Sequence, residues 1–322
     1  MDSRLRGNDS PLSGYHRNMQ KLSAKQLWLL VVLTVVWGLN WPVMKLGVTG
    51  MPPLLFRTMS MWLGLPVLAL ALVVMKVPFA MPRKHWPELL LLTSTNMFVW
   101  HVCIILAIQS LSSGRAAILG YTMPIFSAVL GAIFFASVMT KRNWMGVAAA
   151  ALGVALLLWH EMTGLSGKPL GVALALTAAA TWALGTQLLR RTKIDTPTLA
   201  ISFWMTVLAC VVMTALTVTF ERDAWVMPSN NSWFAIVYNA VLVFGFAHAA
   251  WFFLARTLPP VASTLSVMMI PILGVFAGAY WLGEVLHWQD WAAVGLMVVA
   301  IASVLAPTKA PTKSTTLATK TP

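Results

Sequence analysis

Most of the second half of the chain repeats the first at an offset of 147 residues, with no gaps from the second apolar span onward. The offset places identical residue types opposite one another, in the pairs Phe56 with Phe203, Trp86 with Trp233, His101 with His248, Pro124 with Pro271, Gly131 with Gly278, and Trp144 with Trp291. The first span of each copy needs an offset of 145, which aligns WGLN at Trp37–Asn40 with WALG at Trp182–Gly185. Matches along all five spans favour duplication over chance similarity between two apolar sequences.

Each copy contains five apolar spans, and an odd number places the two copies in a membrane with opposite orientations. About 20 apolar residues cross the ~30 Å hydrocarbon core of a bilayer. We expect spans near residues 26–46, 53–75, 86–109, 115–138, 143–160, 169–190, 198–220, 232–255, 261–283 and 288–306. The predicted fold class is an all-α membrane protein with ten transmembrane helices in two inverted five-helix repeats. This architecture is typical of secondary transporters, whose substrate site lies near the midplane where the repeats meet.

Composition excludes an ordinary soluble domain. Of the 322 residues, 59% are hydrophobic and 10% are charged, with a mean hydropathy of +0.78. A soluble domain carries about 25% charged residues. The expected segments are a disordered N-terminal tail (1–25), a first repeat (26–160), a linker (161–168), a second repeat (169–306) and a disordered C-terminal tail (307–322).

The two tails are polar, and we assign them no function. Residues 1–18 lack hydrophobic periodicity and are similar to translated interspersed repeats, which makes Met19 a candidate for the true start. We expect no cleavable signal peptide, because the first apolar run is long and lacks an A-x-A exit. Cys103 and Cys210 lie inside apolar spans, and we interpret both as small core residues, not as a disulfide or a metal pair.

The net charge of +13 indicates membrane topology, because most basic residues fall in alternate loops. One side would hold 17 of the 22, namely Arg4, Arg6, Arg17, Lys21, Lys25, Lys76, Arg83, Lys84, Lys141, Arg142, Arg190, Arg191, Lys193, Arg256, Lys309, Lys313 and Lys320. The opposite side would hold Lys45, Arg115, Lys168 and Arg222. The positive-inside rule makes the first side cytoplasmic and places both termini there. We therefore expect a multi-pass protein of the bacterial cytoplasmic (inner) membrane that contacts lipids, and no nucleic-acid partner, since no basic-aromatic groove accompanies the charge.

Several longer motifs carry a family resemblance. They are WGLNWPVMKLG at Trp37–Gly47, PPLLFRTMSMWLG at Pro52–Gly64, AIQSLSSGRAAILGYTMPIFSAVLG at Ala107–Gly131, TWALGTQLLRR at Thr181–Arg191 and LPPVASTLSVMMIPILGVFAGAYWLGEVL at Leu258–Leu286. With them the chain resembles the EamA-type transporter family of the drug/metabolite transporter superfamily, from about residue 26 to 306. The resemblance implies a central cavity lined by helices one, three, four, six, eight and nine. It also implies transport of small metabolites, amino acids or toxic compounds, often outward, so we expect an exporter.

The chain departs from the family pattern at one acidic pair. The family commonly carries an acidic residue near the ends of helices four and nine, but Glu284 in helix nine is matched by Ser137 in helix four. We therefore interpret Glu284 as a helix-end or interfacial residue and not as a proton carrier.

Two histidines are the sharpest candidates for a transport site. None of the nine acidic residues lies in the middle of a span, where proton-coupled carriers often place one. His101 and His248 do lie deep in spans, at equivalent positions, and an imidazole titrates near pH ~6.5. We expect them to line the cavity, and proton coupling through them is a further hypothesis. The alternative is that each histidine only bonds a neighbouring carbonyl and holds the bundle.

Aromatic and polar residues inside the spans complete the predicted substrate site. They are Trp37, Asn40, Trp100, Tyr121 and Trp182, with Trp41 and Gln187 as further members. Such a pocket suits an amphipathic small molecule, or a cationic one bound by cation–π contacts. Simple packing is the alternative for each residue. Arg57 begins helix two near the outer face, and we expect it to snorkel to headgroups or to cap a helix, although it could attract an anion.

Prolines and small residues predict where helices bend and pack. Pro124 and Pro271 sit in the middle of spans four and nine, where proline kinks a helix and could provide a hinge. Small-xxx-small pairs allow close approach, and we expect them to pack helices four and nine or their neighbours; they are Ser127 with Gly131 and Gly274 with Gly278. As evidence for a homodimer these pairs are weak.

Other function classes have less support. A membrane enzyme acting on lipid or peptide would be indicated by a GxSxG or HExxH motif, by paired Asp residues in the spans or by a metal-ligand cluster. The sequence contains none of these, so we expect no catalytic residue, metal or cofactor. The GxxxxGK[ST] motif that would indicate ATP-driven pumping is also absent from the sequence. A passive channel or an accessory membrane subunit stays open as the alternative to a carrier.

Overall fold

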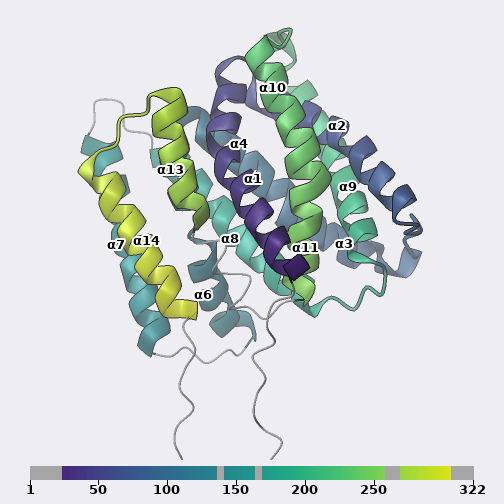
Figure 1. Cartoon of the computed structure of the whole chain (residues 1–322), viewed down its shortest axis with the longest axis horizontal. Coiled ribbons are helices and arrows are strands. Elements are labelled where there is room, and N and C mark those ends of the chain that lie inside the picture. The colour runs from purple at the N-terminus through teal and green to yellow at the C-terminus, as the bar shows by residue number, and fades with distance from the viewer. Residues whose placement is uncertain (1–23, 136–140, 164–168, 258–268, 306–322) are drawn as a thin grey trace, which may run out of the picture.

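A computed structural model describes residues 24–135, 141–163, 169–257 and 269–305, and the regular structure of these residues is helical throughout (Figure 1). A helix, continuous or interrupted, lies at each of the ten expected places. The two tails up to residue 23 and from residue 306, and residues 164–168 of the expected linker, lie outside the described part.

The first copy contains two uninterrupted helices, then two interrupted spans, then a final helix. Its elements are α1 (Ala24–Thr49), α2 (Pro53–Val74), the 3-10 turn η1 (Arg83–His85), α3 (Trp86–Thr93), the π-helical η2 (Ser94–Phe98), α4 (Val99–Ser110), α5 (Ser113–Gly120), α6 (Met123–Phe135) and α7 (Lys141–Thr163).

The second copy follows the same order as far as it is described. Its elements are α8 (Pro169–Arg191), α9 (Thr198–Phe220), the 3-10 turn η3 (Arg222–Ala224), α10 (Asn230–Tyr238), the π-helical η4 (Asn239–Ala247), α11 (His248–Thr257), α13 (Met269–Leu282) and α14 (Trp288–Leu305).

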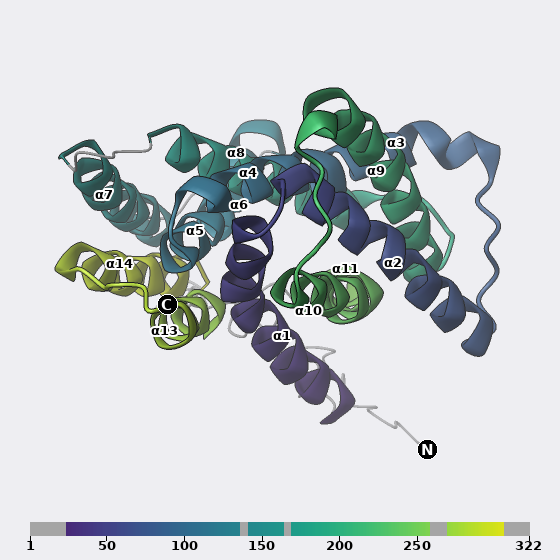
Figure 2. The ribbon, with the colours of Figure 1, turned by 90° about the horizontal axis from the view of Figure 1, so that it is seen from above.

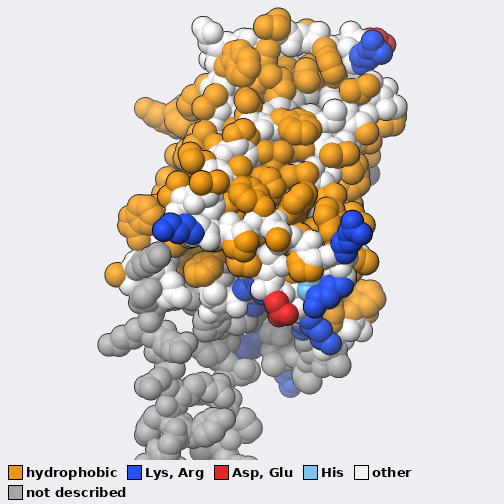
Figure 3. Space-filling view, turned by 90° about the vertical axis from the view of Figure 1, so that its right-hand side faces the viewer, with side chains coloured by type: hydrophobic (Ala, Val, Ile, Leu, Met, Phe, Trp, Pro, Cys, Tyr) orange, Lys and Arg blue, Asp and Glu red, His pale blue; other side chains and the backbone are white. Residues whose placement is uncertain are grey.

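Seven helices of the described residues are long and apolar enough to cross a membrane. They are Gln26–Thr49, Pro53–Val74, Arg83–Ser110, Ser113–Phe135, Pro169–Arg191, Thr198–Phe220 and Asn230–Thr257, and Met269–Leu282 is a shorter apolar helix. Figure 3 shows hydrophobic side chains in a broad belt across one face, with most of its visible Lys and Arg toward the lower end. The chain is a multi-pass membrane protein.

Contacts between the copies come in matched sets. Helix α1 packs on α13, as α8 packs on α5 and α6. Helix α2 packs on η4, as α9 packs on α3 and η2, and α7 lies against α14. Figure 2 shows α1 between α13 on one side and α10 and α11 on the other. The two copies therefore exchange equivalent surfaces, and their first helices lie at the centre.

Two helix N-termini of the first copy are capped by carboxylates of the second. Glu221 accepts hydrogen bonds from the backbone N–H groups of Leu54 (3.0 Å) and Leu55 (2.8 Å) at the start of α2. Glu284 accepts from Ser113 N–H (2.6 Å), Ser113 Oγ (2.8 Å) and Gly114 N–H (3.2 Å) at the start of α5. The first N–H groups of a helix have no partner within the helix, and leaving them unbonded near lipid is costly. Glu284 thus has the helix-end role that its position in the sequence indicated.

Candidate functional site

A cavity lies where the two copies meet, enclosing about 440 Å³ of space, part of which is open to the exterior. Ten of its lining residues belong to the first copy: Trp37, Asn40, Trp41, Met44, Arg57, Trp100, His101, Ile104, Tyr121 and Met123. The other three, Trp182, Val243 and His248, belong to the second. All seven residues expected to bind substrate line this cavity. Their contact with a substrate stays a prediction.

Two π-helical segments at equivalent positions precede the two histidines. Segment η2 ends three residues before His101, and η4 ends directly before His248. Under the 147-residue offset, Ser94–Phe98 falls within the equivalent of η4. A π-helical turn inserts an extra residue, so it re-aims the side chains that follow, and such turns are frequent at functional sites. The motifs gave no indication of these turns.

The two histidine rings meet in the cavity, with centroids 5.1 Å apart. They are 2% and 3% exposed, and Phe244 lies against both, stacked on His248 and tilted against His101. His248 Nδ1 is 2.9 Å from the carbonyl oxygen of Val243 in its own helix. Neither ring nitrogen of His101 has a hydrogen-bond partner among the described residues. His248 therefore partly fits the structural alternative, whereas His101 keeps both nitrogens available to a ligand.

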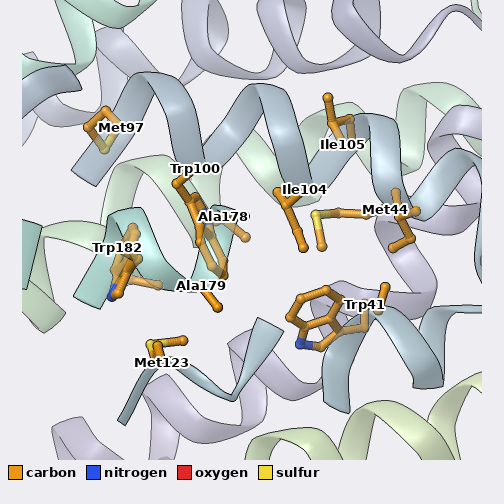
Figure 4. Packing of buried hydrophobic residues seen from close by; sticks show 14 of the residues in the cluster. Trp41, Met44, Met97, Trp100, Ile104, Ile105, Met123, Ala178, Ala179 and Trp182 are labelled. Carbon is orange, nitrogen blue, oxygen red and sulfur yellow. The ribbon is translucent and has the colours of Figure 1, made fainter. Parts of the chain in front are cut away.

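Aromatic rings form one wall of the cavity. Trp182 contacts Trp100 (centroids 5.0 Å apart) and Trp37 (6.1 Å), and the Trp37 ring also lies 5.9 Å from that of His248. Figure 4 shows Trp41, Trp100 and Trp182 around a common space with Met123. Trp182 Nε1 is buried without a partner among the residues described. The wall offers apolar ring faces and one unused N–H donor.

Span four is interrupted at Tyr121 and Thr122, directly before Pro124. Helix α5 ends at Gly120 and α6 begins at Met123, so Pro124 occupies the first turn of α6, where a missing N–H costs little. Tyr121 is 3% exposed, and its ring lies 6.1 Å from that of Trp41. The break directs the Tyr121 side chain into the cavity. Pro271 lies in the first turn of α13 as described, and hinge motion at either proline stays a prediction.

The small residues pack in two different ways. A Cβ atom on Gly274 would lie 3.0 Å from Cδ1 of Trp41 and 3.1 Å from Ala117 Cβ, so Gly274 makes room for α1 and α5. A Cβ on Gly278 would meet the Oγ of Ser113, at the start of α5. Ser127 instead accepts a hydrogen bond from Gln187 Nε2 (2.7 Å) on α8, and Gly131 is buried on the same helix as Ser127. The fourth and ninth spans therefore meet through α5 and α13, while Ser127, on α6 of the fourth span, faces α8, which is the sixth span.

Arg57 lines the cavity and does not snorkel to the surface. It is 1% exposed, with its Nη1 donating to Asn239 Oδ1 (3.1 Å) and its Nη2 2.7 Å from Met44 Sδ. The expected surface role is wrong because Arg57 lies on the inward face of α2. The same face carries Ser60, Met61 and Gly64, all buried, at spacings of three, four and seven residues. That helical spacing was the signal in the sequence that could have identified it.

The charge of the cavity is positive. Its lining contains one arginine and no Asp or Glu among the residues described. Arg57 Nε and Asn40 Oδ1 are both buried without a partner there. A buried ion without a counter-ion costs on the order of several kcal/mol, which an arriving group of opposite charge would offset. The described residues hold no group of His, Cys, Asp and Glu suited to a metal ion.

Comparison with known proteins places this geometry in a family. The EamA-like transporter family matches residues 24–159 and again residues 169–306. The chain belongs to the EamA-like transporter family. The double match also identifies the two copies as EamA-like repeats, which accounts for the exchange of equivalent surfaces in the fold.

Relatives extend the likeness over most of the chain. The uncharacterized inner membrane transporter YedA of Escherichia coli (strain K12) is 28% identical over 281 residues, which cover 85% of this chain and 89% of YedA. The uncharacterized transporter YoaV of Bacillus subtilis is 22% identical over 250 residues, covering 77% and 86% of the two chains. A probable amino-acid metabolite efflux pump of Salmonella typhimurium is 24% identical over 293 residues, covering 87% and 94%. The names of all three describe transporters.

A solved crystal structure supports the fold alone. It superposes with a TM-score of 0.66 at 16% identity, covering 87% of this chain and 96% of the other.

Proposed function

We propose that this EamA-like protein is a secondary transporter that exports small organic metabolites by alternating access of its two repeats. The observation that supports this most is the cavity between the copies. Residues that correspond by duplication, Trp37 with Trp182 and His101 with His248, meet there in pairs. In transporters built from inverted repeats, the substrate site lies at the repeat interface and the repeats rock about it.

The proposal includes ten crossings, inverted repeats and cytoplasmic termini in the bacterial inner membrane. Support comes from the odd number of spans in each copy and from the 17 basic residues on one side. In Figure 1, α1 begins and α14 ends toward the lower side, where Figure 3 shows most of the visible Lys and Arg. Single cysteines in the 76–87 and 161–169 loops test this topology. An impermeant thiol reagent outside the cell should label the second loop only, and labelling of the first loop instead would contradict it.

Rocking of one copy against the other would break and re-form polar contacts between them. On one side of the bundle, Glu284 caps α5 and Arg115 Nε lies 2.8 Å from Asp290 Oδ1. Near the start of α3, Thr192 Oγ1 donates to Glu88 Oε1 (2.5 Å), again across the copies. Each tie is a few hydrogen bonds of modest net strength. They can therefore open and close without unfolding the apolar packing within each copy.

The substrate is a small amphipathic molecule, because the cavity lining combines tryptophan rings with a few polar groups. A relative named as a probable amino-acid metabolite efflux pump makes amino acids and their analogues the first solutes to test. Proton coupling through the two histidines is part of the proposal. No catalytic step is proposed, since the family and its named relatives are transporters.

Counterflow separates a carrier from a channel. Growth inhibition by a panel of amino acids, analogues and dyes, with the gene deleted and overexpressed, first selects the solute. Purified protein in liposomes loaded with that unlabelled solute should then take up the labelled form faster than empty liposomes do. Equal uptake into loaded and empty liposomes would favour the channel, and no uptake of any panel solute would reject the proposed function.

A further inference from the structure

We propose that the cavity binds an organic carboxylate, with its charged group on Arg57 and its apolar body against the tryptophan wall. The inference rests on the proposed transport function and specifies the substrate class. It goes beyond the sequence-based expectation, which favoured an amphipathic molecule or a cationic one bound by cation–π contacts and placed Arg57 at the surface. The difference arises from a single residue, because Arg57 lies in the cavity and not at the surface.

Arg57 carries a charge that the described protein does not neutralise. Its guanidinium group bonds an amide oxygen and a thioether sulfur, from Asn239 and Met44, and both are uncharged. Its Nε–H donates to no atom of the described residues. Two nearby rings, of Phe56 and Phe244, have centroids 5.8 Å and 5.6 Å from the guanidinium carbon. Ring faces lower the cost of burying a cation but supply no counter-charge.

Three carboxylates that tie the two copies together are already bonded to other groups of the protein. Glu221 caps the start of α2, the helix that carries Arg57, through the N–H groups of Leu54 and Leu55. Glu284 caps α5, and Asp290 is paired with Arg115. The described cavity lining itself contains no acidic residue. A buried arginine in this state is suited to a carboxylate that arrives with the ligand, since the two groups match as a planar fork.

Other unsatisfied atoms of the lining fit the rest of such a ligand. Asn40 Oδ1 is a buried acceptor, Trp182 Nε1 a buried donor, and the two ring nitrogens of His101 can serve as either. Trp100 and Trp182 line the same cavity, contact each other and present apolar ring faces. The ligand is therefore an anion at one end, apolar in its body, and able to hydrogen-bond along one edge. A cation is disfavoured, because Arg57 would repel it in a site of low dielectric constant.

Three ligands of one shape test the charge preference on the unmodified protein. They are 3-phenylpropanoate, 3-phenylpropanamide and 3-phenylpropylamine, which carry negative, zero and positive charge. Binding is measured by tryptophan fluorescence and by thermal shift in detergent. We expect the carboxylate to bind at least tenfold more tightly than the amide, and the amine to bind most weakly. Equal affinities, tighter binding of the amide or amine, or no binding of the carboxylate would overturn the inference.

Variants assign the preference to Arg57. Arg57→Gln should remove the difference between carboxylate and amide, and Arg57→Lys should keep part of it, since lysine retains the charge but lacks the fork. Arg222→Gln, at an exposed position in η3, is the matched control and should leave the difference intact. If Arg57→Gln does not fold, the three ligands on the unmodified protein decide alone. A carboxylate preference that survives Arg57→Gln would contradict the inference.

The outcomes separate this inference from the proposed function. Binding of the carboxylate without counterflow of any solute would reject transport and keep the anion site. Counterflow of cationic solutes, with no advantage for carboxylates, would keep transport and reject the anion site.

Discussion

His101 and His248 occupy equivalent positions in the two copies and meet at 5.1 Å, yet their surroundings differ. His248 is held by the carbonyl of Val243 in its own helix, whereas His101 has no partner for either nitrogen within the described structure. The same offset relates the π-helical turns that precede them. The two copies therefore share one backbone arrangement at this site, but the hydrogen bonds made by the equivalent histidines differ.

The contrast is sharper at the polar lining. Arg57 corresponds to Trp204, whose Nε1 donates to the carbonyl of Phe79 at an exposed site. Asn40 corresponds to Gly185, where any side chain would collide with Asn96. Paired residues define the centre of the cavity, while residues present only in the first copy supply its charge and most of its polar groups. We infer that the first copy recognises the substrate and the second completes the enclosure.

The largest expected effect distinguishes the paired histidines from the other histidines. His101→Ala should lower the counterflow rate by at least about tenfold, equivalent to about 1.4 kcal/mol of lost interaction with the ligand. His248→Ala should lower both transport and thermal stability, since its bond to Val243 contributes about 1 kcal/mol. His85→Ala and His287→Ala, at span ends, are the controls and should transport normally. Equal effects of all four changes on transport would contradict the special role of His101 and His248.

Proton coupling through the pair is tested by changing both histidines together. His101→Gln combined with His248→Gln should flatten the pH dependence of net transport between pH ~6 and ~7, where an imidazole ordinarily titrates. Solute exchange should persist in part, because exchange needs binding and rocking but no net proton movement. An unchanged rate and pH profile in the double variant would exclude the histidines from the mechanism and leave Trp37 and Tyr121 as the next candidates.

A smaller effect is expected when the second copy is made to resemble the first beside Trp41. Gly274 corresponds to Ser127, and Gly274→Ser would place a Cβ atom 3.0 Å from the Trp41 ring. Displacing that ring should lower transport by about fivefold, since overpacking of this kind costs ~1 kcal/mol or more. Gly295→Ser is the control, because nothing lies within 4 Å of its Cβ position. Normal transport by Gly274→Ser would show that the Trp41 position does not matter.

The smallest effect is expected at the acidic residue that only the second copy carries. Glu284→Gln keeps an acceptor for the N–H groups of Ser113 and Gly114 but removes its charge from the N-terminus of α5. The melting temperature should fall by about 2 °C, and solute affinity should not change. Asp223→Asn, in the exposed turn η3, should leave both quantities unchanged. A large loss of affinity in Glu284→Gln would give Glu284 a role in the substrate site.

Much of the fold could be predicted because apolar length and repetition are read directly from residue types. The ten expected places all contain helices, although seven of the described helices meet the length and hydropathy expected of a membrane span. The cavity residues could be predicted because duplication places Trp37, Trp182 and the two histidines at matching depths. Arg57 is expected at the surface because it lies one turn from the start of α2, but its spacing from Ser60, Met61 and Gly64 indicates the inward face of that helix. The π-helical turns could not be predicted, since their extra residue depends on packing between helices and not on local composition.

Protection of a cavity cysteine by solute tests most directly whether the space between the copies is the substrate site. Ile104→Cys, in a background with Cys103→Ala and Cys210→Ala, places one thiol in the lining, and Thr219→Cys provides an exposed control at the end of α9. We expect the solute giving the strongest counterflow to slow N-ethylmaleimide labelling of the Ile104→Cys protein several-fold and to leave labelling of the Thr219→Cys protein unchanged. If solute does not change the labelling rate of the Ile104→Cys protein, and that protein still shows counterflow, the substrate site lies elsewhere.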